Sequence, residues 1–138
     1  MNIEHLEKIV EDLCENFEVY APPVPVELML RQPRDGMWEE VDIAQMSGSF
    51  RRISERYSPR MTIARLLVRH IMVSEWGKQY ELATIKRDEN MINAFARMIL
   101  MPRDMVLGLT SSMRTPTLLS DHFEIPESDA EIRLLELN

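Results

Sequence analysis

The sequence is poor in cysteine and glycine. Its single cysteine, Cys14, excludes an intrachain disulfide, and the lack of a CxxC pair or a Cys/His cluster excludes a thiolate zinc site. With 4 glycines the chain carries no P-loop and no GxGxxG motif, so no glycine-rich phosphate cradle is predicted. A Ser-His-Asp order is absent as well. The sequence therefore offers no catalytic motif built on a thiol, a phosphate loop or a serine triad.

Long apolar runs and an excess of positive charge are also missing. No run approaches the roughly 20 apolar residues that span a bilayer, and the N-terminal stretch MNIEHLEKIVED has acidic residues and no apolar signal core. Sixteen Lys and Arg against 23 Asp and Glu give a net charge of −7. Because DNA and anionic membranes attract positive surfaces, we expect neither as the main partner. We expect a cytoplasmic protein.

What the sequence does contain is enough apolar residues for one core. Its 138 residues are 45% hydrophobic, which fits a single domain over residues 1–138. Apolar residues recur at helical spacing, and prolines separate the segments. Helices are predicted over residues 2–18, 26–32, 59–76 and 88–100, and two short ones in the tail.

Residues 34–57 have a different pattern. Asp35-Gly36 and Ser47-Gly48-Ser49 are turn signals, and the stretch between them alternates in part between apolar and polar residues. We therefore expect one or two β-hairpins, and with them an α+β fold that is mainly helical. The arginines nearby are either solvated charge or a surface for an acidic partner: Arg51, Arg52, Arg56 and Arg60.

Two helical segments, RMTIARLLVRHIM at 60–72 and ENMINAFARMILMP at 89–102, carry the most specific pattern. Together they resemble the ImmA/IrrE family of zinc metallopeptidase-like proteins, where an Arg-x-x-Thr-x-Ala run leads into HExxH and a later helix reads E-x-x-A-N-x-F-A with Leu-Met-Pro at its end. The matching residues are Arg60, Thr62, Ala64, Glu89, Asn93, Phe95, Ala96, Leu100, Met101 and Pro102. The resemblance implies a leader helix at 1–20, a zincin-like core at 22–108 and a helix-turn-helix-like extension at 109–138.

The chain departs from that family at the metal ligands. Where the family has HExxH, this chain has Arg65-Leu66-Leu67-Val68-Arg69, and only the carboxylate ligand is kept, as Glu89. Guanidinium has no lone pair to donate, two guanidinium groups repel a dication, and leucine cannot accept a proton. We expect no catalytic residue, no metal and no cofactor. Instead, Arg65 and Arg69 are predicted to form a buried ion pair with Glu89, or with Asp88 if the register shifts by one residue.

The resemblance implies a regulatory protein that binds a partner without cutting it. Active members of the family resemble proteases that act on helix-turn-helix repressors of prophages, mobile elements or stress regulons, so the expected partner is such a repressor or an antitoxin. The 11 methionines are either core filling or a pliable groove for a partner peptide. The candidate groove or partner-binding residues are Arg60, His70, Asn93 and Arg97.

Two other functions stay open at this point. A metal-dependent peptidase would need an unconventional site around His70, Glu75 and Glu89. A DNA-binding regulator would use the arginines of residues 51–69. Its helix-turn-helix-like tail is unsuited to phosphate, because one arginine, Arg133, stands among acidic residues in the second helix. Those acidic residues are Glu127, Asp129, Glu131 and Glu136.

Overall fold

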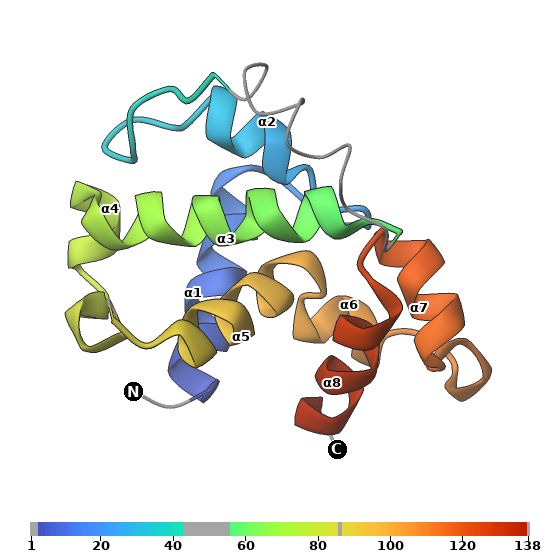
Figure 1. The fold of residues 1–138 in the computed structure, drawn as a ribbon. Coiled ribbons are helices and arrows are strands. Elements are labelled where there is room, and N and C mark those ends of the chain that lie inside the picture. The colour runs from blue at the N-terminus through green and yellow to red at the C-terminus, as the bar shows by residue number, and fades with distance from the viewer. Residues whose placement is uncertain (1–2, 43–55, 86, 138) are drawn as a thin grey trace.

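The computed structural model describes residues 3–42, 56–85 and 87–137, and the described residues form helices that pack around α5 (Figure 1). α5 contacts α1, α3 and α8, while α2 packs on α3 and α7 packs on α8. The helices are α1 (Ile3–Asn16), α2 (Val26–Arg31), α3 (Ser58–Val73), α4 (Glu75–Lys78), α5 (Glu89–Leu100), α6 (Arg103–Leu107), α7 (Pro116–Phe123) and α8 (Glu127–Leu137), with short 3-10 helices at Leu82–Ile85 and Ser111–Met113. The prediction of a mainly helical chain is confirmed.

The predicted sheet is wrong. Among the described residues, neither 34–42 nor 56–57 contains a strand, while the rest of the expected hairpins, 43–55, lies outside the described residues. The turn at Asp35-Gly36 is present, with Gly36 at φ +80°. The residues after it pack onto helices instead of pairing with a strand. Trp38 is buried and donates from Nε1 to the carbonyl of Met29 at 3.1 Å, and Val41 N–H donates to the Leu30 carbonyl at 3.0 Å.

The helix predicted over 59–76 is divided at Ser74. The Ser74 hydroxyl donates to the Ile71 carbonyl at 2.7 Å and accepts from Gly77 N–H at 2.9 Å, so one side chain ends α3 and caps α4. A Cβ on Gly77 would lie 1.8 Å from the Ile71 carbonyl oxygen. The two helices can turn this tightly only because residue 77 has no side chain.

Helix α5 forms the centre of the core. Asp88 caps its start, accepting from Met91 N–H at 3.2 Å, and the carboxylate also suits the positive end of the helix dipole. Much of the helix is buried, including Phe95, Met98 and Leu100 at 0% exposure. The motif that carries the family resemblance is therefore also the main packing surface of the protein. Full burial of Met98 and of the following Met101 favours core filling over a groove for these two methionines.

The tail forms the two expected short helices, which lie together at one end of the molecule (Figure 1). Thr115 caps α7 by accepting from Leu118 N–H at 3.3 Å. Glu124, in the left-handed region at φ 55°, ends that helix. Leu119, Phe123 and Ile125 are all 0% exposed, so the tail packs an apolar cluster, while Leu118, Ile132 and Leu135 are exposed. No helix of the described residues is both long and apolar enough to cross a bilayer.

Candidate functional site

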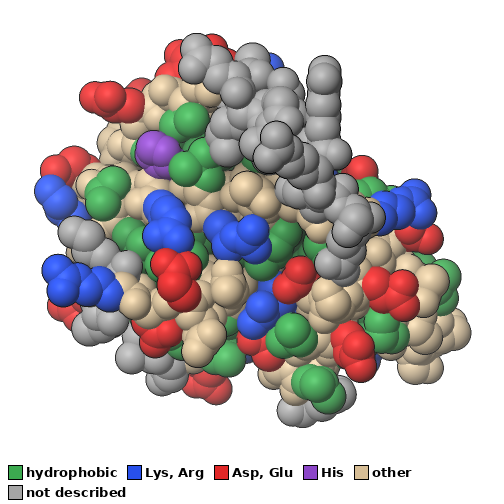
Figure 2. Space-filling view, in the orientation of Figure 1, with side chains coloured by type: hydrophobic (Ala, Val, Ile, Leu, Met, Phe, Trp, Pro, Cys, Tyr) green, Lys and Arg blue, Asp and Glu red, His purple; other side chains and the backbone are tan. Residues whose placement is uncertain are grey.

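The face shared by α3 and α5 holds the residues that stand at the metal-ligand positions of the resemblance. Arg69 Nη2 donates to both carboxylate oxygens of Glu89, at 3.0 Å each, from one helix to the other. The pair is on the surface, not in a buried hollow as expected: the side chains are 46% and 65% exposed. Figure 2 shows Lys and Arg side chains next to acidic ones over the middle of this face, open to view.

Arg65 does not join that ion pair. Its Nη2 donates to the Thr62 hydroxyl at 3.2 Å, one turn back along α3. Leu66 is partly buried and packs against the core. The pair lies at the surface because α3 turns its other side, with Ala64, Leu67 and Val68, toward the interior. Of the three former ligand positions, the structure thus brings two together and leaves Arg65 separate.

Arg60 connects elements that are far apart in the sequence. Its Nη1 donates to the two carboxylate oxygens of Glu27 at 3.1 and 3.0 Å, its Nη2 to the Val24 carbonyl at 2.8 Å, and its Nε to the Glu124 carbonyl at 3.0 Å. The Arg60 side chain is 15% exposed. These contacts hold α2, α3 and the end of α7 together, and they leave few donors of Arg60 for a partner.

The remaining predicted contact residues lie on α3 and α5. Asn93 and Arg97 lie on α5, and Arg97 reaches Asp129 of α8 at 3.5 Å. His70 lies half-buried near the end of α3. In the arginine-rich stretch, Arg51 and Arg52 lie outside the described residues, and exposed Arg56 pairs with Asp121 at 3.2 Å.

A buried ion pair between Glu7 and Arg133 joins α1 to α8. Arg133 is 0% exposed; its Nη2 donates to Glu7 Oε1 at 2.6 Å and its Nε to the Met101 carbonyl at 2.9 Å. Glu7 is 3% exposed and has a second guanidinium, that of Arg103, at 3.8 Å. The only arginine of α8 is thus held inside the protein. The second helix of the tail therefore presents no basic side chain to DNA, in keeping with its acidic composition.

Glu136 extends this cluster toward α5. Its carboxylate lies 3.9 Å from Arg97 Nε and 3.8 Å from Arg133 Nη1, within ion-pair range but beyond hydrogen-bond length. Burial raises the pKa of Glu136; the positive charges of Arg97 and Arg133 oppose this rise and do not cancel it. The charged form of Glu136 is therefore disfavoured in the folded protein.

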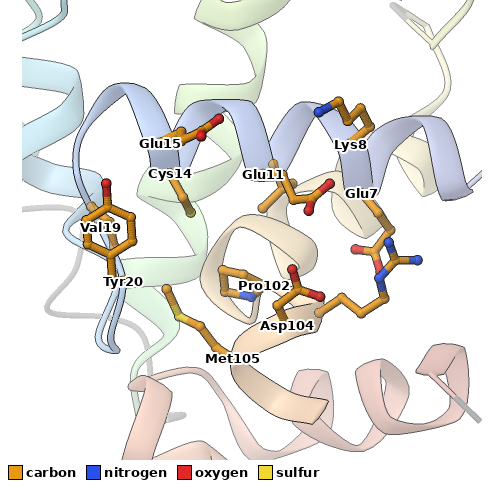
Figure 3. Close-up of a pocket in the computed structure, with 12 residues that line it drawn as sticks. Glu7, Lys8, Glu11, Cys14, Glu15, Val19, Tyr20, Pro102, Asp104 and Met105 are labelled. Carbon is orange, nitrogen blue, oxygen red and sulfur yellow. The ribbon is translucent and has the colours of Figure 1, made fainter. Parts of the chain in front are cut away.

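A groove lies between α1 and the start of α6 (Figure 3), with a volume of about 450 Å³. We call it the α1–α6 groove. Cys14 of α1 and Met105 of α6 point toward each other across it, and Tyr20 stands at one end. Burial raises the pKa of the Cys14 thiol to about 11, so the thiol is protonated and weakly reactive at neutral pH. None of the residues proposed from the sequence as partner-binding lines this groove.

The sequence contains a signal for the buried ion pair between Glu7 and Arg133. Glu7 follows Leu6 and precedes Val10 by three residues, which places a carboxylate on the apolar side of α1. Arg133 stands in the same way three residues after Ala130. A charged residue at a core position of a helix predicts a buried partner of opposite charge. The sequence does not show that these two residues are partners of each other.

Three comparisons with known proteins give no relatives for this chain: no protein-family model, no curated protein and no solved structure matches it. Within the described residues, no group of three or more His, Cys, Asp or Glu side chains is placed to hold a metal ion. The resemblance to the ImmA/IrrE family therefore depends on the sequence motifs of α3 and α5.

Proposed function

We propose that this chain is a non-catalytic protein of the ImmA/IrrE type that acts in the cytoplasm by binding another protein. The observation that carries the proposal is the contact between Arg69 and Glu89. By resemblance, these positions hold a histidine and a carboxylate that bind zinc in active members. Here a guanidinium makes the contact to the carboxylate, and a guanidinium cannot coordinate a metal.

Regulation through a helix-turn-helix repressor or antitoxin is the form of protein binding that the resemblance favours. The charge distribution is in keeping with a protein partner. The net charge is −7, and the basic side chains of the tail helices and of α3 that the structure describes are largely engaged within the protein. A partner with a basic surface is the natural complement of such a protein.

A rebuilt metal site tests the resemblance directly. The triple variant Arg65→His/Leu66→Glu/Arg69→His restores HExxH on α3, beside the existing Glu89. If the register is right, this variant gains one zinc ion per chain, measured by elemental analysis after dialysis, and its melting temperature falls when EDTA is added. The wild-type protein is expected to bind no stoichiometric zinc and to melt at the same temperature with and without EDTA.

A matched control separates a rebuilt site from adventitious binding. The same triple variant with Glu89→Ala lacks the third ligand and should lose most of the zinc affinity. The proposal is overturned if the wild-type protein carries stoichiometric zinc and cleaves a protein in a zinc-dependent manner. A folded triple variant that binds no more zinc than wild type would instead reject the alignment with the family motif.

A further inference from the structure

We propose that the α1–α6 groove binds a cationic amphipathic segment of a partner protein, with an apolar side chain on its floor and Lys or Arg side chains at its rim. This inference rests on the proposed function, because it names the kind of partner that a protein-binding module of this shape takes. The groove is formed by residues of α1, of the turn after it and of the first turn of α6 (Figure 3).

The floor of the groove suits an apolar anchor. Val10 and Cys14 of α1 and Met105 of α6 provide apolar surface there. Cys14 is 7% exposed and Met105 is half-buried, so the groove reaches the edge of the core. Methionine adapts its shape to different side chains, which favours a binding floor. Tyr20, 74% exposed at the end of the groove, is the type of aromatic residue that dominates protein interfaces.

The rim of the groove is left with negative charge. Its two basic residues are engaged: Lys8 pairs with Asp12 at 3.1 Å and Arg103 with Glu7 at 3.8 Å. Three rim carboxylates have no ion pair or hydrogen bond to a side chain in the part of the chain that the structure describes. These are Glu11, Glu15 and Asp104. Figure 3 shows Glu11 and Asp104 on the two walls of the groove, where one bound cation can approach both.

The size of the groove limits its occupant to a few side chains. A volume of about 450 Å³ lies within the range of roughly 300–1,000 Å³ typical of small ligand sites. A stable interface between two folded surfaces buries more than about 1,000 Å² and needs a larger, flatter contact. A short helical or extended segment inserts its anchor here and lays its basic residues along the rim. A polyamine would match the rim charge alone and would leave the apolar floor unused.

A fluorescent amphipathic peptide of leucine and lysine residues is the probe, and its binding to the wild-type chain is followed by anisotropy. Two comparison ligands separate charge from apolar contact: the same peptide with glutamate in place of lysine, and spermine as competitor. We expect the lysine peptide to bind, its affinity to fall as salt is raised, and the glutamate peptide to show no binding. Because Cys14 lines the groove and is the single cysteine, bound peptide should also slow its alkylation by iodoacetamide, which is followed at alkaline pH because the thiol is weakly reactive at neutral pH.

Two sets of variants locate the binding. Glu11→Gln/Glu15→Gln removes two rim charges without changing shape, and it should weaken binding roughly tenfold at low salt. Met105→Ser removes apolar floor and should weaken binding of the peptide but not of spermine. The matched control is Glu131→Gln on α8, an exposed carboxylate outside the groove, which should leave the affinity unchanged. Thermal melts of each variant confirm that the fold is intact.

The outcomes distinguish this inference from the proposed function. If Glu131→Gln weakened peptide binding as much as the rim variant does, the attraction would be non-specific and the proposed groove site would be overturned. The same conclusion would follow if spermine displaced the peptide and Met105→Ser had no effect on peptide binding. No peptide binding to the wild-type protein would overturn it as well. Neither result bears on the zinc measurements with the rebuilt HExxH variant, which test the proposed function separately. If Cys14 were protected from alkylation without added peptide, and more so at higher protein concentration, the groove would bind a second copy of the chain. That result would reject the cationic segment as its occupant.

Discussion

Replacement of Arg133 by methionine removes the guanidinium that neutralises Glu7 inside the protein. Arg133 is 0% exposed and lies 2.6 Å from Glu7, which is 3% exposed; Arg103, at 3.8 Å, is then the carboxylate's nearest cation. Breaking a buried ion pair from one side costs roughly 3–5 kcal/mol, because the remaining charge stays desolvated. The hydrogen bond to the Met101 carbonyl is lost too. Since single domains are stable by about 5–15 kcal/mol, Arg133→Met should remove a large part of the stability.

Two further variants decide whether the cost comes from the stranded charge. Glu7→Met/Arg133→Met removes both charges and should recover most of the loss, since apolar replacements of a buried pair are often neutral or stabilising. Arg103 is freed by this change, and at 39% exposure it can turn to water. Lys78→Ala breaks an exposed ion pair, because the side chain of Lys78 is 64% exposed and that of Glu75 is 78% exposed. This substitution should lower the free energy of unfolding by less than about 1 kcal/mol.

Urea denaturation followed by far-UV circular dichroism measures these free energies of unfolding. Equal slopes with urea concentration for all variants show that the comparison concerns stability and not a change of the unfolded state. The reasoning is refuted if Arg133→Met costs no more than Lys78→Ala, or if the double variant is as unstable as the single one. The second result would mean that shape and hydrogen bonding, and not charge, make Arg133 important.

Three other predictions concern an exposed ion pair, a buried carboxylate and a close backbone approach. Glu89→Ala breaks an exposed ion pair and should cost less than about 1 kcal/mol in a urea titration, far below the cost of a buried pair; a loss above 3 kcal/mol would contradict its exposure. The pKa of Glu136 is higher in the folded protein than in the unfolded chain. The stability that Glu136 contributes is therefore fully present below the pKa of the unfolded chain, and it is lost as pH rises through the pKa of the folded protein. Glu136→Gln should therefore gain stability relative to wild type between acid and neutral pH, whereas a pH-independent difference would contradict the raised pKa. Gly77→Ala places a Cβ against the Ile71 carbonyl and should lower the free energy of unfolding by about 1–3 kcal/mol or more, measured by thermal melt. Gly108→Ala is the control and should cost less, because the nearest neighbour of its Cβ is 3.2 Å away.

Local patterns predicted the helices well because each carries its own signals. Apolar spacing located α1, α3 and α5, and the structure shows a helix at each of these places. The division of α3 from α4 was missed, although Ser74 and Gly77 are the residues that produce it. A periodic pattern continues through such a break, and only the close approach of the Ile71 carbonyl reveals it.

The sheet and the site were harder to predict, for the same physical reason. The stretch after Asp35-Gly36 has the alternation of a strand, but the partners of its backbone and of Trp38 belong to α2, which sequence alone does not bring near. The spacing of Arg69 placed it on the side of α3 that meets Glu89. Whether that contact is buried depends on which side of α3 the other helices cover, and tertiary packing decides this.

The contact between Glu7 and Arg133 has a consequence for a chain that is still being synthesised. α1 leaves the ribosome early, yet the cation that neutralises its inward carboxylate lies 126 residues further along. Until then Glu7 can be compensated only by Arg103, which lies 3.8 Å away and is partly exposed, so docking of α1 is less favourable than in the complete chain. A chain that stops before residue 133 lacks the nearer cation of Glu7, so we expect its α1 to be docked less firmly and its apolar side to be more open to chaperones and proteases.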